Sequence, residues 1–231
     1  MKSLFLLILF APLALLGAET GYRLDKSPHE PTDLVSLQTG AKLYVNYCLG
    51  CHSMQYMRYG GLSEFGLTEQ QIKDNLLFTA DKVGEPMKGP MDPKAAKQWF
   101  GVAPPDLSVV SRSRGADWLY TYLRTFYRDP KTATGWNNAV FENVGMPHAL
   151  WSLQGERAYD HDKRQWRELG KGTLSQVEYD IAVRDLVNFL VYVGEPAASE
   201  RKAIGIVVLF VLGILFIFTY LLKKEYWKDV P

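Results

Sequence analysis

An uncharged stretch of 20 residues near the C-terminus, residues 203–222, most constrains what this chain can fold into. At about 1.5 Å of rise per residue, a helix of that length spans roughly 30 Å, the thickness of the hydrocarbon core of a bilayer. Two basic residues precede the stretch and two follow it, as is common at the ends of membrane helices. The stretch therefore predicts one transmembrane anchor helix over residues 203–222, followed by a tail over residues 223–231.

The first residues of the chain have the composition of an export signal. Lys2 begins a weakly positive segment, an apolar run extends from Leu4 to Leu16, and Ala18 is a small residue suited to a cleavage site. The run is too short to span a bilayer comfortably, so a signal peptide over residues 1–18 is predicted, with an uncleaved anchor as the alternative. Residues 19–200 are then expected outside the cytoplasm, and the C-terminal tail inside it.

The segment between the two apolar ends, residues 19–200, is long enough for one globular domain. It carries 20 Lys and Arg against 23 Asp and Glu, a net charge of −3, so the overall charge of +1 comes from the ends of the chain. A domain without a basic patch does not favour nucleic acid as a partner. Its mildly acidic charge favours basic partners instead.

The two cysteines of the chain lie in a Cys-x-x-Cys-His sequence formed by Cys48, Cys51 and His52. A disulfide across this gap would close almost no loop, and a zinc site needs four ligands. A thioredoxin-like dithiol follows a strand, whereas the residues before this motif are typical of a helix. The pattern instead indicates one covalently attached haem c. Two thiols form thioethers with the haem vinyl groups, and the histidine ligates the iron.

One predicted helix precedes this motif, and another lies late in the chain. The first places Gly40, Tyr44 and Cys48 on one face, where the glycine allows a second helix to approach closely. In the second, Ser175 and Glu178 form a capping-box pattern. Its apolar stripe and stop signals are Val177, Ile181, Leu186, Phe189 and Leu190, then Gly194 and Pro196. The pair resembles the N- and C-terminal helices of class I cytochromes c, which predicts a mainly α haem domain with long loop insertions.

The ligand on the other face of the haem iron is not settled by the residues alone. Met146 lies between a glycine and a proline in the turn "ENVGMPHALW", which can hold a thioether in place without secondary structure. His148 is the rival in the same turn, and Met87 and Met91 lie in another loop rich in Pro and Gly. A methionine or histidine ligand selects electron transfer, whereas an open site permits ligand binding or catalysis. Composition favours Met146 modestly.

Residues 103–130 offer further contacts to a haem. Pro104 and Pro105 form a rigid apolar pair that can wall a flat ligand. Arg112 and Arg114 suit the haem propionates, because a guanidinium matches carboxylate geometry. The dense aromatic residues that follow can line the macrocycle. The segment is equally compatible with a surface loop followed by an amphipathic helix whose aromatic residues belong to the core.

Taken together, these motifs resemble the cytochrome c1 family, the haem subunits of cytochrome bc1 complexes. "CHSM", "APPDLS", "GMPHALW" and the C-terminal membrane helix occur in the order found in that family, over nearly the whole chain. The haem contacts that the resemblance implies are Met146 as the sixth iron ligand, Arg114 and Trp118 at the propionates, and Pro104 with Pro105 against the ring. The family often has a tyrosine in the place of Trp118, and Tyr120 is the alternative for that contact.

The resemblance implies an electron relay, and not an enzyme acting on its own. In this family a Rieske iron–sulfur subunit reduces the haem, which passes the electron to a cytochrome c, while quinol is oxidised elsewhere in the complex with cytochrome b. The short signal implies a bacterial chain anchored in the lipid of the inner membrane, with its haem domain in the periplasm. Two alternatives remain. One is a membrane-anchored cytochrome c of a terminal oxidase or shuttle, and the other is an open-site haem enzyme or gas sensor.

Overall fold

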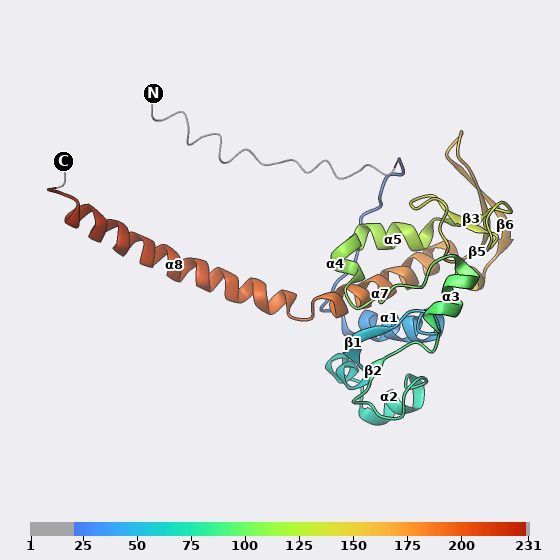
Figure 1. The fold of residues 1–231 in the computed structure, drawn as a ribbon, viewed down its shortest axis with the longest axis horizontal. Helices are drawn as coiled ribbons and strands as arrows, with labels where there is room; N and C mark the ends of the chain where they lie inside the picture. The colour runs from blue at the N-terminus through green and yellow to red at the C-terminus, as the bar shows by residue number, and fades with distance from the viewer. Residues whose placement is uncertain (1–20, 230–231) are drawn as a thin grey trace.

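The computed structural model describes residues 21–229, so the predicted signal peptide over residues 1–18 lies outside the described residues. Figure 1 shows a body built from short helices and small sheets, from which a long C-terminal helix extends. The first and the last helices of the body lie side by side in its centre. The body is therefore organised around the contact between its first and last helices, and the segments between them in the sequence surround that contact.

The body is mainly helical, which confirms the predicted fold class. The helical elements are α1 (Leu34–Tyr47), the 3-10 helix η2 (Tyr59–Phe65), α2 (Glu69–Asn75), α3 (Pro93–Phe100), α4 (Val110–Arg114), α5 (Ala116–Arg124), α6 (Trp151–Gln154), α7 (Gln176–Gly194) and α8 (Ala198–Tyr226). The strands are β1 (Met54–Arg58), β2 (Pro86–Met87), β3 (Phe126–Arg128), β4 (Trp136–Asn138), β5 (Gly155–Asp160) and β6 (Gln165–Lys171). Among the described residues they pair as three antiparallel two-stranded sheets, β1–β2, β3–β4 and β5–β6.

The contact between α1 and α7 forms the centre of the body. Gly40 permits the close approach, because a Cβ at its position would lie 2.1 Å from the carbonyl oxygen of Asp185 and 2.6 Å from the Cβ of Phe189. Tyr44, one turn further along α1, packs on Phe189 with ring centroids 5.7 Å apart. In the same interface, Ser36 Oγ donates a hydrogen bond of 2.7 Å to the Asp185 carboxylate. The predicted pairing of the helix before the motif with a late helix is confirmed.

Replacing Gly40 by alanine should lower the free energy of unfolding by about 3 kcal/mol, the upper end of the usual cost of overpacking. The added methyl group has no space unless α1 and α7 move apart. Thermal unfolding of the detergent-solubilised protein, followed by circular dichroism, measures the effect. Gly84→Ala is the matched control, because a Cβ at Gly84 meets nothing within 4 Å. Equal unfolding temperatures for the two variants would contradict this description of the interface.

Helix α7 begins and ends where the sequence predicts. Ser175 Oγ accepts the backbone N–H of Glu178, and the Glu178 carboxylate accepts the backbone N–H of Ser175, which forms the expected capping box. The helix ends at Gly194, and a Cβ at that position would lie 2.2 Å from Oγ of Ser111 in α4. The C-terminal glycine of α7 therefore both ends the helix and allows α4 to pack against it.

In the first turns of α7 the buried apolar stripe lies on a different face from the predicted one. Leu186, Phe189 and Leu190 are buried as expected, but Val177 and Ile181 are 68% and 44% exposed, so the expectation for these two residues is wrong. Tyr179 and Val183 are the buried apolar residues of these turns, at 1% and 0% exposure. The physical reason is that this part of α7 packs towards α5, where the Tyr179 hydroxyl donates to the carbonyl of Leu123 at 2.8 Å.

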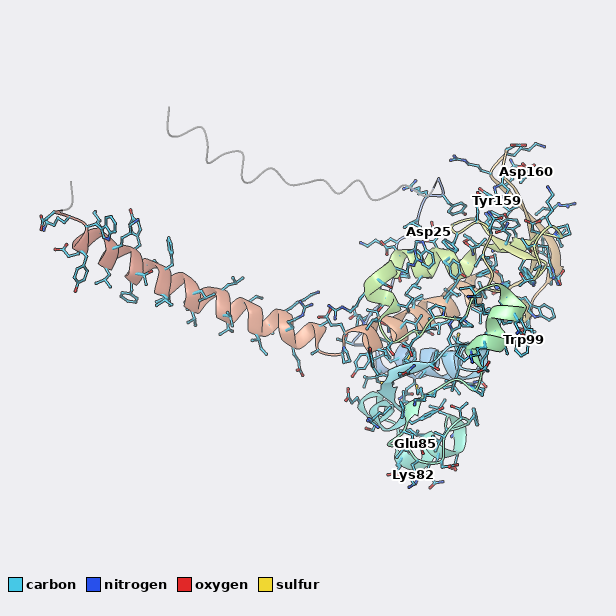
Figure 2. All side chains as sticks on the ribbon, viewed as in Figure 1. Asp25, Lys82, Glu85, Trp99, Tyr159 and Asp160 are labelled. Atoms are coloured by element: carbon cyan, nitrogen blue, oxygen red, sulfur yellow. The ribbon has the colours of Figure 1, made fainter. Side chains whose placement is uncertain are left out.

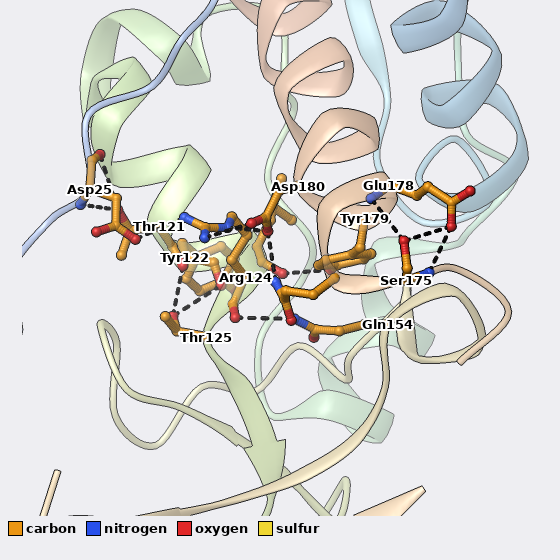
Figure 3. Close-up of polar contacts among 12 residues, drawn as sticks. Asp25, Thr121, Tyr122, Arg124, Thr125, Gln154, Ser175, Glu178, Tyr179 and Asp180 are labelled. Carbon is orange, nitrogen blue, oxygen red and sulfur yellow. Dashed lines mark hydrogen bonds and ion pairs between the residues drawn. The ribbon is translucent and has the colours of Figure 1, made fainter. Parts of the chain in front are cut away.

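Polar contacts tie the extended segment before α1 to α5 and α7 (Figure 3). The backbone N–H of Asp25 donates to Thr121 Oγ1 at 2.8 Å. The Arg124 guanidinium bridges the carboxylates of Asp25, at 2.8 Å, and Asp180, at 2.6 Å. Gln154 donates to the backbone carbonyl of Arg124 at 3.2 Å. Together these contacts hold α5, which carries several of the candidate haem contacts, in a fixed position against α7.

The predicted loop insertions contain secondary structure of their own. The hairpin β5–β6 projects from the body, with Tyr159 and Asp160 close to its far end (Figure 2). Its aromatic pair Tyr159 and Trp166 packs with ring centroids 4.6 Å apart. At the opposite end of the body, Lys82 and Glu85 lie in the loop between α2 and β2. The insertions therefore enlarge the body at two ends without entering the α1–α7 contact.

Helix α8, Ala198–Tyr226, contains the whole of the predicted anchor. Among the described residues, its segment Glu200–Tyr226 is the one helical stretch long and apolar enough to cross a membrane, and none of its most apolar part is buried against the body. A helix with every face apolar and exposed is unstable in water and suits a lipid environment. This finding fits a single-pass membrane anchor.

Candidate functional site

The Cys-x-x-Cys-His motif lies where α1 ends. Cys48 caps the helix, and its carbonyl oxygen accepts the backbone N–H groups of Cys51 at 3.0 Å and of His52 at 2.8 Å. This tight turn brings the two thiols and the imidazole into succession on a compact piece of backbone. Cys48 is half-buried and Cys51 is exposed. Burial raises the pKa of the Cys48 thiol to about 12 and that of Cys51 as well, so both thiols are protonated at neutral pH.

The imidazole of His52 is buried and held in one orientation. Its Nδ1 lies 2.7 Å from the carbonyl oxygen of Pro105, and because a carbonyl can only accept, Nδ1 carries the proton. The lone pair of Nε2 is therefore available to a metal, as in many histidine ligands. Burial lowers the pKa of His52, which the Pro105 carbonyl and Asp106 partly oppose, and the neutral ring is favoured. Tyr44 also donates from its hydroxyl to the backbone carbonyl of His52 at 2.8 Å.

The segment that carries Pro104 and Pro105 is attached to the residues after the motif. The backbone N–H of Leu107 donates to the carbonyl of Ser53 at 2.8 Å, and Asp106 accepts the backbone N–H of Gln55 at 3.0 Å. These bonds fix the carbonyl of Pro105 beside His52. The predicted role of the proline pair was an apolar wall, whereas the contact that the structure describes is this backbone hydrogen bond.

Met146 lies in a turn that neighbouring segments hold closely. A Cβ on Gly145 would lie 2.7 Å from the carbonyl oxygen of Phe100 and 3.1 Å from a methyl group of Val102, so the turn packs directly on the end of α3. The thioether of Met146 is partly buried against the core. The hydroxyl of Tyr122 in α5 donates to Met146 Sδ at 3.3 Å. Burial raises the pKa of Tyr122, so this hydroxyl remains a donor.

The rival ligand, His148, has contacts that account for it without a metal. Its ring stacks on Phe126 with centroids 4.8 Å apart and meets Trp136 edge-on at 5.1 Å. Its Nε2 lies 2.8 Å from the side-chain oxygen of Gln154. Burial lowers the pKa of His148 to about 3, which keeps the ring neutral. Met87, another candidate, is fully buried in the strand pair β1–β2.

The arginine and aromatic candidates fall into two separate groups on α4 and α5. The guanidinium of Arg114 lies 5.0 Å from the ring centre of Trp118, and Trp118 stacks on Tyr122 at 4.6 Å with the ring planes 12° apart. Tyr120, the alternative to Trp118, lies instead under the guanidinium of Arg124 at 4.5 Å. The structure therefore places Trp118, and not Tyr120, in the group that includes Arg114 and reaches Met146.

Chemically, the donor set fits a c-type haem. It comprises two adjacent thiols, a neutral imidazole with an available Nε2 and a held thioether, the groups that attach and ligate such a haem. The sequence predicts all four residues, and the structure supplies contacts that the sequence did not indicate, from Tyr122, Phe100 and Asp106. The spacing of Arg114, Trp118 and Tyr122, four residues apart each time, is the one signal from which the Tyr122 contact could have been found.

The chain is similar to several known proteins. Residues 25–230 match the model of the Cytochrome C1 family. Cytochrome c1 of Allochromatium vinosum is 47% identical over 96% of this chain and 96% of that protein. The ammonia monooxygenase gamma subunit of Nitrosomonas europaea is 48% identical over 99% of this chain and 98% of that protein. A chain of a solved hyperthermophilic respiratory Complex III has a TM-score of 0.44 at 17% identity, covering 85% of this chain and 77% of that chain.

Proposed function

This chain belongs to the cytochrome c1 family, and on that premise we propose how it holds its haem and which partners it serves. It is an electron-transfer haem subunit of the cytochrome bc1 complex. The finer proposal is one haem c, attached through thioethers to Cys48 and Cys51 and ligated by His52 and Met146. The observation that carries it is the turn after α1, in which both thiols adjoin a histidine whose Nδ1 bonds to Pro105 and whose Nε2 has no hydrogen-bond partner among residues 21–229.

The bound haem supplies a one-electron couple between ferric and ferrous iron. The residues of the chain set the conditions for that couple. Pro105 fixes the tautomer and the orientation of His52, and Tyr122 holds the sulfur of Met146. A buried environment with a thioether ligand disfavours the extra charge of the oxidised state and so raises the potential. Arg114 and Trp118 are proposed at the haem propionates, where the guanidinium of Arg114 would offset the negative charge of a carboxylate.

We further propose that residues 19–200 form the haem domain outside the cytoplasm and that residues 203–222 span the bacterial inner membrane, with residues 223–231 in the cytoplasm. The apolar, exposed helix α8 supports the anchor, and the predicted export signal supports the orientation. In this arrangement the haem domain is held at the membrane surface, where it can meet other subunits of the complex.

The proposed partners are a cytochrome b, a Rieske iron–sulfur subunit as the electron donor and a cytochrome c as the acceptor. The sequence family supports this assembly. A second assembly is favoured by one specific observation, because a relative of almost the same identity is named as a subunit of ammonia monooxygenase. In that case the chain would be an electron-transfer haem protein associated with a monooxygenase.

Purification of the full chain from its native membranes in a mild detergent distinguishes the two assemblies. We expect a b-type cytochrome and an iron–sulfur protein to purify with it, and added quinol to reduce its haem. Washing the bound complex with concentrated salt is the control, because salt screens the charges that hold weakly and nonspecifically associated proteins. Purification together with monooxygenase subunits, and without quinol-driven reduction of the haem, would contradict the bc1 assembly.

A further inference from the structure

Tyr122 makes a contact with Met146 that belongs to neither the attachment motif nor the iron ligands. Its hydroxyl donates to Met146 Sδ at 3.3 Å, and the tyrosine is buried. A thioether sulfur has two lone pairs. One can bind the iron while the other accepts this hydrogen bond. The contact is therefore compatible with the proposed ligation of the haem by Met146.

The phenol ring of Tyr122 is held on two sides. Trp118 stacks on it with centroids 4.6 Å apart and planes 12° apart, and Phe126 meets it edge-on at 5.0 Å. The stack continues beyond Trp118, whose ring also receives the guanidinium of Arg114, at 5.0 Å, and meets Phe141 edge-on at 6.3 Å. A ring clamped in this way keeps its hydroxyl directed at the sulfur, which a freely rotating side chain would not do.

We propose that Tyr122 is a positioning residue that holds Met146 as the sixth ligand and raises the potential of the haem, and that Trp118, besides its proposed contact with a propionate, acts through Tyr122 by holding its ring. The proposal rests on the proposed function, because it requires ligation by Met146. The positive end of the hydroxyl dipole points at the sulfur of Met146. With Met146 bound to the iron, this dipole would disfavour the higher charge of the ferric state and reduce electron donation from the sulfur, and both effects would favour the reduced form.

The central test is Tyr122→Phe in the full-length protein, which removes one hydroxyl and keeps the ring. We expect a lower midpoint potential in an optical redox titration and a weakened methionine–iron charge-transfer band in the oxidised protein. Tyr179→Phe is the matched control. Tyr179 is also buried, and its hydroxyl donates to the backbone carbonyl of Leu123 in α5 at 2.8 Å, away from Met146. The Tyr179→Phe variant also loses one phenol hydroxyl, but that hydroxyl does not contact Met146. The midpoint potential of its haem should therefore equal that of the unaltered protein.

A double-variant cycle tests the role of Trp118. Trp118→Leu should lower the potential in the same direction as Tyr122→Phe, and the double variant should shift it by less than the sum of the two single shifts, because both changes act on one contact. Fully additive shifts would show that Trp118 acts on the haem independently of Tyr122 and would overturn its action through Tyr122. An unchanged potential in Tyr122→Phe would overturn the whole inference and leave the proposed function intact. A missing charge-transfer band in the unaltered protein would overturn both.

Discussion

The Met146→Lys variant should keep its haem but show a midpoint potential lower by a few tenths of a volt, given that axial ligands alone span about 0.8 V. A thioether is a soft ligand that favours ferrous iron, whereas an amine donates more strongly and favours the ferric state. The methionine–iron charge-transfer band should disappear. A redox titration of the purified protein, followed in the visible spectrum, measures both changes.

The adjacent histidine provides the comparison for this variant. His148 is stacked on Phe126 and bonded to Gln154, so His148→Ala should cost stability but leave the charge-transfer band in place. The two residues lie in one turn, two positions apart, so this pair of variants tells directly which of them ligates the iron. If His148→Ala removes the band and Met146→Lys retains it, the sixth ligand has been assigned to the wrong side chain.

The Cys51→Ala variant should lose most of its covalently bound haem. One thioether remains possible at Cys48, but the turn after α1 presents both thiols together, and maturation of the protein is expected to require both. Haem staining after denaturing, reducing electrophoresis should fall to a small fraction of the level in the unaltered protein.

Gly50→Ala is the matched control for the cysteine variant. It lies inside the same motif, and a Cβ at Gly50 meets nothing within 4 Å. The added methyl group should leave haem staining unchanged, because the thiols and the histidine keep their positions. Full staining in Cys51→Ala would show that its thiol is not needed for attachment, and loss of staining in both variants would point to a general folding defect.

The parts of the structure that follow from local patterns were predictable, and those that depend on which neighbouring element covers a helix were not. Gly40 and Tyr44 indicated a close helix contact because their spacing places them on one face, and Phe189 is their partner. The same spacing suggested a buried position for Val177 and Ile181. In these turns the buried residues are instead Tyr179 and Val183, on another face, because this part of α7 packs towards α5. Periodicity alone does not tell which of two apolar faces a neighbouring helix covers.

The candidate site shows the same division. The motif identified Cys48, Cys51 and His52, because covalent attachment and ligation need those residue types at that spacing. The hydrogen bond from Tyr122 to Met146 joins residues 24 positions apart in two different segments. A contact of that kind depends on the packing of α5 against the Met146 turn, which single-sequence patterns do not specify.

The central claim is one haem covalently attached to this chain through both cysteines, and the intact mass of the protein tests it most directly. The chain purified from native membranes should be measured by mass spectrometry under denaturing conditions. The account predicts the mass of the polypeptide plus one haem, with the added mass on the peptide that contains Cys48 and Cys51. A bare polypeptide that carries two thiols or a disulfide at these positions would contradict it.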